Sequence, residues 1–282
     1  MTDITVVTTF HKPGLDLYGQ RFLDSFAENV DPKIKLLVYA EDCKPSVDPL
    51  CENIKVLDAK EVLPKLNAFK ERWKDDPKAN GIPPDEIKRR RPRDWNKEFK
   101  WDAIRFANKT YAVFDACERS KDWCVWMDAD TFVHNNWSYK DFAALLPDTS
   151  WITYVGRGKG SQTWPECGFY GMNLNHPMCI QFLKEFERFY EDADNGIFEL
   201  EEWHDSFVFG HILNQLKPID SNVLDYSAEM YLREARTGGG GHPLINTVLG
   251  KWIDHMKGNR KVAGKSQRSD IIVSRKEGYW NA

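Results

Sequence analysis

The chain has 282 residues, is 41% hydrophobic and 13% aromatic, and carries a formal net charge of −4 at pH 7. This length can bury a large core, and the charge excludes a nucleic-acid binder that relies on a uniformly basic surface. No apolar run reaches the ~20 residues that span a bilayer, and the first residues show no basic, cleavable leader. Six cysteines without C-x-x-C spacing indicate reduced thiols rather than a zinc site, so we expect a cytoplasmic protein.

The first 42 residues indicate a strand, a helix and a second strand. Residues 4–10 (ITVVTTF) and 34–42 (IKLLVYAED) are short apolar runs of the kind found in strands that are buried on both faces. The segment between them places apolar residues at helical spacing, at Leu17, Phe22, Phe26 and Val30. This order predicts an α/β fold with a right-handed crossover.

Residues 60–96 are polar and contain two proline clusters, so we expect an insertion or a mobile loop there. The basic run KRRRPR, residues 88–93, fits a solvated loop, and it also fits a surface for an anionic acceptor such as a phosphorylated glycan or DNA.

The rest of the chain alternates apolar runs and amphipathic segments. We expect helices over 97–118, 177–192 and 204–216, and strands over 123–127 and 150–156. The buried side of the first of these helices should contain Phe99, Ala103, Ile104, Phe106 and Ala107. The glycine run 238–241 predicts a flexible segment that could act as a lid.

An acidic pair follows the strand at 123–127. Asp128 and Asp130 are two residues apart, so on extended backbone both carboxylates face the same side. Ligands of open α/β sheets bind beyond the carboxyl ends of strands, where such oxygens could hold Mg²⁺ or Mn²⁺. The alternative is a turn in which the aspartates bond to nearby backbone.

The second motif lies near the C-terminus, where His255, Gly258 and Lys261 are spaced three apart. A neutral imidazole is a ligand that Mn²⁺ accepts beside carboxylates. A glycine lets a phosphate approach the backbone, and an ammonium supplies a charge for a phosphate oxygen. The alternative is a polar turn with a solvated basic face.

Together, D-x-D after a strand and H-x-x-G-x-x-K far downstream resemble the signature of family-8 glycosyltransferases, the glycogenin-like group with the GT-A fold. The resemblance implies one GT-A domain, with a mixed central sheet flanked by helices, over residues 1–282. It implies that Asp128, Asp130 and His255 hold Mn²⁺ (or Mg²⁺), and that the segment 236–282 completes this site. The family usually has Pro-Trp after the lysine, whereas this chain has Val262 and Ala263, which leaves the donor and the stereochemistry open.

The same resemblance suggests where the nucleotide-sugar donor and the acceptor bind. Residues assigned to the donor are Thr8, Thr9, Tyr18, Glu41, Asp42, Arg105, Asp128, Ala129, Gly258 and Lys261. Residues assigned to the sugar or acceptor are Glu166, Cys167, Gly168, Trp203, His204 and Asp205. Asp102 could pair with Arg105 on the surface or meet a sugar hydroxyl, and Asp205 could instead cap its helix.

The function expected is therefore metal-dependent transfer of a sugar from a nucleotide-diphosphate sugar, with UDP as the expected nucleotide. The acceptor would be a hydroxyl, on a glycan or less readily on DNA. Arg105, Lys261 and Asp205 are the candidate catalytic residues, with Asp205 as the base if the reaction inverts. Two other classes stay open at this point: a nucleotidyltransferase acting on sugar phosphates, and a non-catalytic carbohydrate-binding protein.

Overall fold

The computed structural model describes residues 1–90, 98–159, 164–230 and 243–281. Within these ranges, no helix combines the length and the apolar character that crossing a membrane requires. The glycine run 238–241 and the arginines at 91 and 93 fall outside the described residues.

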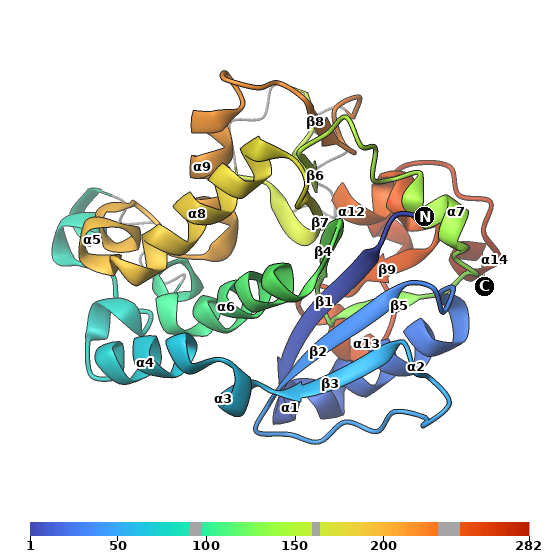
Figure 1. Ribbon diagram of the computed structural model, residues 1–282, viewed down its shortest axis with the longest axis horizontal. Helices are drawn as coiled ribbons and strands as arrows, with labels where there is room; N and C mark the ends of the chain where they lie inside the picture. Colours follow the sequence, from blue (N-terminus) through green and yellow to red (C-terminus); the bar gives the residue numbers. More distant parts are fainter. Residues whose placement is uncertain (91–97, 160–163, 231–242, 282) are drawn as a thin grey trace.

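A seven-stranded sheet runs through the centre of the molecule in the order β3-β2-β1-β4-β7-β6-β8 (Figure 1). Its strands are β1 (Ile4–His11), β2 (Lys35–Glu41), β3 (Ile54–Asp58), β4 (Trp123–Met127), β6 (Ile152–Val155), β7 (Glu166–Asn173) and β8 (Val223–Asp225). The first four in chain order pair in parallel, β7 is antiparallel to both β4 and β6, and β8 is parallel to β6. This confirms the expected α/β fold with a mixed central sheet.

The longer helices are α2 (Gln20–Asn29), α4 (Pro64–Trp73), α6 (Ala103–Arg119), α8 (Pro177–Glu191) and α9 (Asp205–Leu216). Short α-helices are α1 (Lys12–Gly14), α3 (Ala59–Val62), α5 (Asp85–Arg90), α7 (Tyr139–Ala143), α12 (Pro243–Asn246), α13 (Arg260–Ala263) and α14 (Gly278–Asn281). A π-helical turn, Leu15–Gly19, leads into α2. Single 3₁₀ turns occupy Pro77–Ala79, Glu98–Trp101, Ala193–Asn195, Ile197–Glu199, Val248–Lys251 and Arg268–Asp270.

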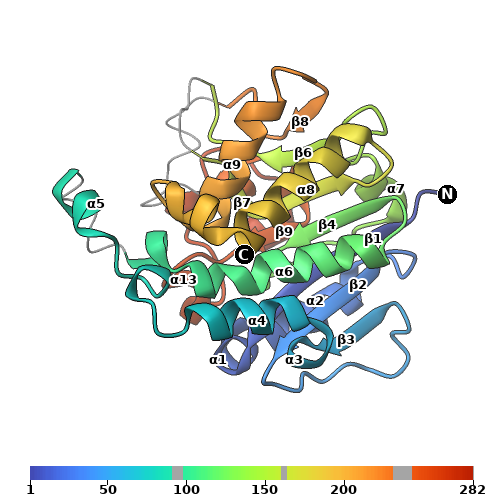
Figure 2. The same ribbon diagram turned by 60° about the vertical axis from the view of Figure 1, so that its left-hand side comes forward.

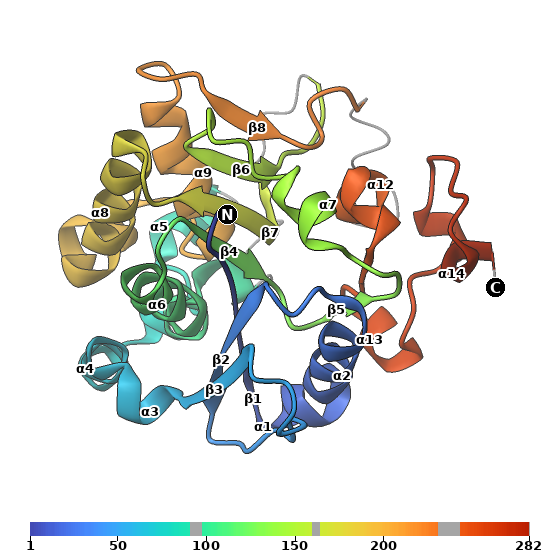
Figure 3. The same ribbon diagram turned by 45° about the vertical axis from the view of Figure 1, so that its right-hand side comes forward.

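The helices form a layer on each side of the sheet. Helices α4, α6, α8 and α9 lie on one side, and α2, α7 and α12 lie on the other (Figure 2, Figure 3). Strand β4 shows why both layers are needed, because all of its side chains are buried and successive ones enter opposite cores. Trp126 packs toward α6 and α9, whereas Val125 packs in the cluster that contains α2.

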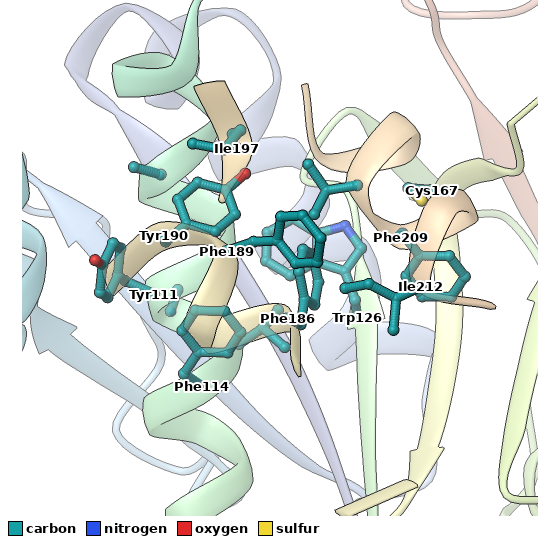
Figure 4. Close-up of a cluster of buried hydrophobic side chains, with 14 of the residues drawn as sticks. Tyr111, Phe114, Trp126, Cys167, Phe186, Phe189, Tyr190, Ile197, Phe209 and Ile212 are labelled. Atoms are coloured by element: carbon teal, nitrogen blue, oxygen red, sulfur yellow. The ribbon is translucent and has the colours of Figure 1, made fainter. Parts of the chain in front are cut away.

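Aromatic side chains join the helices of the first layer (Figure 4). Phe114 of α6 meets Phe186 of α8 edge to face, with ring centroids 5.4 Å apart. Tyr111 of α6 meets Tyr190 of α8 in the same way, at 6.0 Å. Such edge-to-face pairs add specific geometry to the burial of large apolar rings, so α6 is held firmly beside the strand that precedes the acidic pair.

A second, two-stranded sheet brings the C-terminal motif to the acidic pair. Strand β5 (Thr131–Val133) pairs antiparallel with β9 (Ile253–His255), and Thr131 is directly opposite His255. Opposed residues in an antiparallel pair lie only about 5 Å apart. Because Thr131 directly follows Asp130 in the chain, this pairing places His255 beside Asp130.

The structure differs from the sequence-based expectations at two places and adds a strand at a third. The described part of 60–96 is largely helical, because Leu66, Phe69 and Trp73 of α4 are buried against α6. The stretch 164–177, for which the sequence predicted no strand, contains β7, whose side chains are all buried and so show no alternation of polar and apolar residues. Phe99 precedes α6 rather than lying on its buried side, and it is 44% exposed.

Candidate functional site

The acidic pair lies in a tight turn between β4 and β5. The backbone N–H of Asp128 donates to the carbonyl of Gly168 (2.9 Å), and the N–H of Thr131 donates to the carbonyl of Asp128 (3.1 Å). The two aspartates therefore lie both in a turn and at the end of a strand. Both carboxylates reach the same point beyond the carboxyl end of β4. The two readings of D-x-D, a turn and a ligand pair, do not exclude each other.

His255 completes a set of three possible metal ligands. Its Nε2 lies 3.5 Å from Oδ2 of Asp128 and 3.2 Å from Oδ1 of Asp130. One ligand atom from each of the three residues lies within 4.8 Å of the others, the one such cluster found among the described residues. Burial opposes protonation of His255, but the two carboxylates outweigh it and raise the pKa of the imidazole to about 9.

Lys261 is the cation nearest to Asp130. Its Nζ lies 2.9 Å from Oδ2 of Asp130 and 4.8 Å from the centre of the Tyr18 ring. Burial opposes the charge on this lysine, yet Asp130 raises the pKa of the ammonium. Gly258 has φ +59°, and a Cβ there would meet no atom within 4 Å. The turn therefore needs glycine for its backbone conformation and leaves open space beside it.

Lys109 of α6 is a central residue that sequence reasoning missed. Its Nζ lies 3.1 Å from Oδ1 of Asp128 and 2.7 Å from Oδ2 of Asp205, and it donates to the carbonyl of Cys167. Burial opposes its charge, but these two carboxylates raise the pKa of the ammonium well above its usual value. The signal in the sequence was its spacing of four from Arg105, which puts both cations on one face of α6.

Glu166 forms a second buried charge cluster on the wall of the site. Arg157 lies 3.2 Å from Oε2 of Glu166, and Lys257 donates to the same oxygen. Burial opposes ionisation of Glu166, but Lys257 and Arg157 outweigh it and lower the pKa of the carboxyl to about 2. Since Lys257 belongs to the loop between His255 and Lys261, this ion pair ties the C-terminal motif to β7.

Gly168 leaves the room that His255 occupies. A Cβ at Gly168 would lie 2.6 Å from Cε1 of the imidazole, closer than any real contact. Cys167 lines the same site, where its carbonyl accepts from Lys109. Cys167 and Gly168 thus contribute to the site through a backbone carbonyl and through the absence of a side chain.

The predicted site residues 203–205 take different roles. Trp203 is fully buried, lines neither of the two cavities described below, and donates its indole N–H to the carbonyl of Leu200. His204 caps α9 by accepting the N–H of Phe207 at Nδ1 (3.3 Å), and its Nε2 lies 3.0 Å from Glu202. The N-cap is therefore His204, and the alternative that Asp205 caps the helix is wrong.

Two cavities meet at the acidic pair. One, of about 750 Å³, is lined by Trp164, Glu166, His204, Asp205 and Lys257 among others. The other, of about 630 Å³, lies at the carboxyl ends of β1 and β2. Both are lined by Arg105, Phe106, Lys109, Asp128, Asp130 and Lys261.

The smaller cavity contains most of the predicted donor residues. Thr9, Tyr18, Glu41, Asp102, Arg105 and Ala129 line it. The hydroxyl of Thr9 donates to Glu41 (2.9 Å), and burial raises the pKa of that carboxyl. Thr8 is fully buried and lines neither cavity, and Asp42 lines a separate hollow of about 1,050 Å³.

Asp102 and Arg105 do not form the surface ion pair considered from the sequence. Asp102 is the N-cap of α6 and accepts the backbone N–H of Arg105 (3.0 Å). The Arg105 side chain is exposed where the two cavities meet. Its guanidinium is thus placed to contact a ligand that extends from one cavity to the other.

The possible metal ligands at the acidic pair suit Mg²⁺ or Mn²⁺. Two carboxylates and one imidazole are hard to borderline ligands, which these cations accept. Gly168 provides the space in which the imidazole lies beside the acids. All six cysteines are free thiols, and none belongs to this cluster.

No protein-family model and no curated protein matches the chain. Solved structures similar to it include the bifunctional glycosyltransferase WbbM, mouse xyloside xylosyltransferase 1 and the Streptococcus pneumoniae glycosyltransferase GlyE. Their sequence identities are 12%, 10% and 10%, and their TM-scores are 0.41, 0.42 and 0.38. Each similarity covers 79% of this chain, but 38%, 84% and 45% of the other chain. The function proposed below rests on the site and not on these distant similarities.

Proposed function

We propose that the protein is a metal-dependent glycosyltransferase that moves a sugar from a nucleotide-diphosphate sugar to a hydroxyl acceptor. The observation that carries the proposal is the cluster of Asp128, Asp130 and His255, with Lys261 2.9 Å from Asp130. This cluster lies where two cavities meet, beyond the carboxyl end of β4. In open α/β sheets ligands bind at such strand ends, next to the strand from which the chain order reverses.

Asp128, Asp130 and His255 would hold Mn²⁺ or Mg²⁺. A divalent cation supplies Lewis-acid stabilisation to the charge that develops on a departing diphosphate. Metal binding also requires a neutral imidazole and free carboxylates, so the proton on His255 would leave and Lys261 would lose its partner Asp130. Lys261 could then contact a diphosphate oxygen, with Arg105 as a second cation on the same wall.

The nucleotide would occupy the cavity at the ends of β1 and β2, where Thr9, Tyr18 and Glu41 offer hydroxyl and carboxylate groups. The sugar and the acceptor would occupy the larger cavity beside Glu166 and Asp205. We propose UDP as the nucleotide and a glycan as the acceptor, which the resemblance to family 8 favours but does not fix.

Retention of configuration is the proposed outcome. In that reaction the bond between the anomeric carbon and the phosphate oxygen breaks, and a bond to the acceptor oxygen forms on the same face. The proton of the acceptor hydroxyl passes to the departing phosphate, so no side chain has to act as base. This agrees with the position of Asp205, whose carboxylate lies 2.7 Å from the ammonium of Lys109.

A nucleotidyltransferase is not favoured, because residues 8–14 run from β1 into α1 without a glycine-rich phosphate loop. A purely carbohydrate-binding protein is not favoured either, because it has no need of a lysine beside a cluster of metal ligands.

The test is release of nucleoside diphosphate from a panel of sugar nucleotides, with Mn²⁺, with Mg²⁺ and with EDTA. Wild type should hydrolyse one donor slowly in the presence of metal, and Asp130→Asn should abolish this. Asp75→Asn is the matched control, because Asp75 is exposed just after α4. No turnover of any donor, or turnover that ignores both EDTA and Asp130→Asn, would overturn the proposal.

A further inference from the structure

The larger cavity has one wall that the metal chemistry does not use. Phe99, Phe106 and Trp164 line this wall together with His204, whose ring contacts all three. The centroid of the His204 ring lies 5.9 Å from that of Phe99, 5.8 Å from that of Phe106 and 5.0 Å from that of Trp164. Three aromatic side chains from the 3₁₀ turn before α6, from α6 itself and from the segment before β7 thus form one surface.

Core packing does not account for this wall. Phe99 is 44% exposed, and neither Phe106 nor Trp164 is fully buried. An aromatic ring left open to water forgoes much of the free energy that burying it would give. Here the three rings line a cavity that is otherwise lined mainly by charged and polar side chains.

A buried ionic cluster holds the wall in place. Lys100 donates to Glu202 (3.0 Å), and His204 lies 3.0 Å from the other oxygen of the same carboxylate. The ammonium of Lys100 also lies 5.2 Å from the centre of the Trp164 ring. Since Lys100 and Glu202 are both buried, this cluster helps to hold His204 and the Trp164 ring in position.

Polar groups line the same cavity as the rings. Arg157, Glu166 and Ser206 line it, and Arg157 has N–H groups beyond the one that meets Glu166 and the one that donates to the carbonyl of Trp164 (3.3 Å). A pyranose has an apolar face of C–H groups and an equatorial ring of hydroxyls. It therefore matches a site that offers both aromatic rings and hydrogen-bonding groups.

We infer that Phe99, Phe106 and Trp164 form an acceptor subsite that binds a pyranose ring against their faces. The inference rests on the proposed function, because it is transfer chemistry at Asp128 and Asp130 that makes the larger cavity the acceptor side. It narrows the acceptor from any hydroxyl compound to a sugar whose ring contacts the aromatic wall. The hydroxyl that is glycosylated would point toward the acidic pair.

The experiment measures sugar binding directly, so it does not depend on turnover. Saturation-transfer NMR would be recorded with methyl glucoside, galactoside, xyloside and N-acetylglucosaminide, in the presence of UDP and diamagnetic Mg²⁺. At least one pyranoside should receive saturation from wild type. Phe99→Ala and Trp164→Ala should each reduce that signal at least fivefold, and Trp164→Phe, which keeps a ring, should retain most of it.

Ile180→Ala is the matched control, because Ile180 is 43% exposed on α8 and lines neither cavity. It should bind sugar as wild type does. Because Phe99 is so exposed, its truncation should leave the melting temperature nearly unchanged, so a loss of signal there reports on binding.

Three results would overturn the inference: no saturation of any pyranoside, equal saturation in wild type and Phe99→Ala, or loss of UDP affinity in Trp164→Ala. The last result would mean that a nucleobase stacks on the wall. Failure of the proposed function has a different signature, namely no donor turnover by wild type, whatever the NMR result.

Discussion

Replacing Gly168 by alanine should separate metal binding from folding. Strand β7 gives Gly168 no left-handed φ, so alanine fits the backbone. The new Cβ, however, would lie 2.6 Å from Cε1, 2.9 Å from Nδ1 and 3.2 Å from Nε2 of His255. To reach an ordinary separation of 3.4 Å or more, the buried imidazole must move by about 1 Å.

A displacement of this size exceeds the tolerance of metal coordination, in which ligand distances vary by about 0.2 Å. We therefore expect Mn²⁺ affinity to fall at least tenfold, equivalent to about 1.4 kcal/mol. Changes to groups that orient metal ligands typically cost about 10- to 100-fold in affinity, so the estimate is in the usual range.

The assay is calorimetric titration with Mn²⁺, together with urea unfolding of the metal-free protein. Gly171→Ala is the control on the same strand, since its Cβ would lie 2.8 Å from side-chain atoms of Leu146 and Thr153, away from the site. Gly171→Ala should lose stability and keep its metal affinity. If Gly168→Ala binds Mn²⁺ as tightly as wild type, His255 is not a ligand and the reasoning fails.

Two further outcomes follow from buried charges. Lys109→Met should lower the free energy of unfolding by about 3–5 kcal/mol, because it leaves Asp128 and Asp205 without their shared cation. In urea unfolding, adding Asp205→Asn should recover part of this loss. A double variant no more stable than Lys109→Met alone would contradict this. Burial lowers the pKa of His134 to about 4 from a usual 6.5. Between these pH values the unfolded state therefore binds more protons than the folded state. The free energy of unfolding should fall as the pH drops through this range, by up to about 3 kcal/mol. His134→Phe keeps the stacking on Tyr279 (4.3 Å) and should flatten that dependence in denaturation measured at pH 7 and pH 4.5, whereas an unchanged slope would mean that other groups cause it.

Local pattern was enough for the main elements of the fold. The strands at 4–11, 35–41 and 123–127 and the helices at 177–191 and 205–216 follow the expected ranges within one or two residues. Apolar periodicity reflects which face of an element is buried, and that information lies in neighbouring residues. Where a strand is buried on both faces, as in β7, the periodicity vanishes, so the sequence did not reveal this strand.

The sequence also singled out the residues of the site that lie in motifs. Asp128 and Asp130 end an apolar run, and His255 and Lys261 share one short segment, so their chemistry could be inferred from residue type and spacing. The structure brings these four together, as the hypothesis of one site requires.

Only the tertiary structure determines which charged side chains lie close enough to interact. The pairing of Thr131 with His255 spans more than 120 residues, and no local signal contains it. Lys109 reaches Asp128 and Asp205, whereas Trp203 is buried outside both cavities. The strength of a buried ion pair depends on the distance between groups remote in sequence and on their removal from water, and both quantities exist only once the chain has folded.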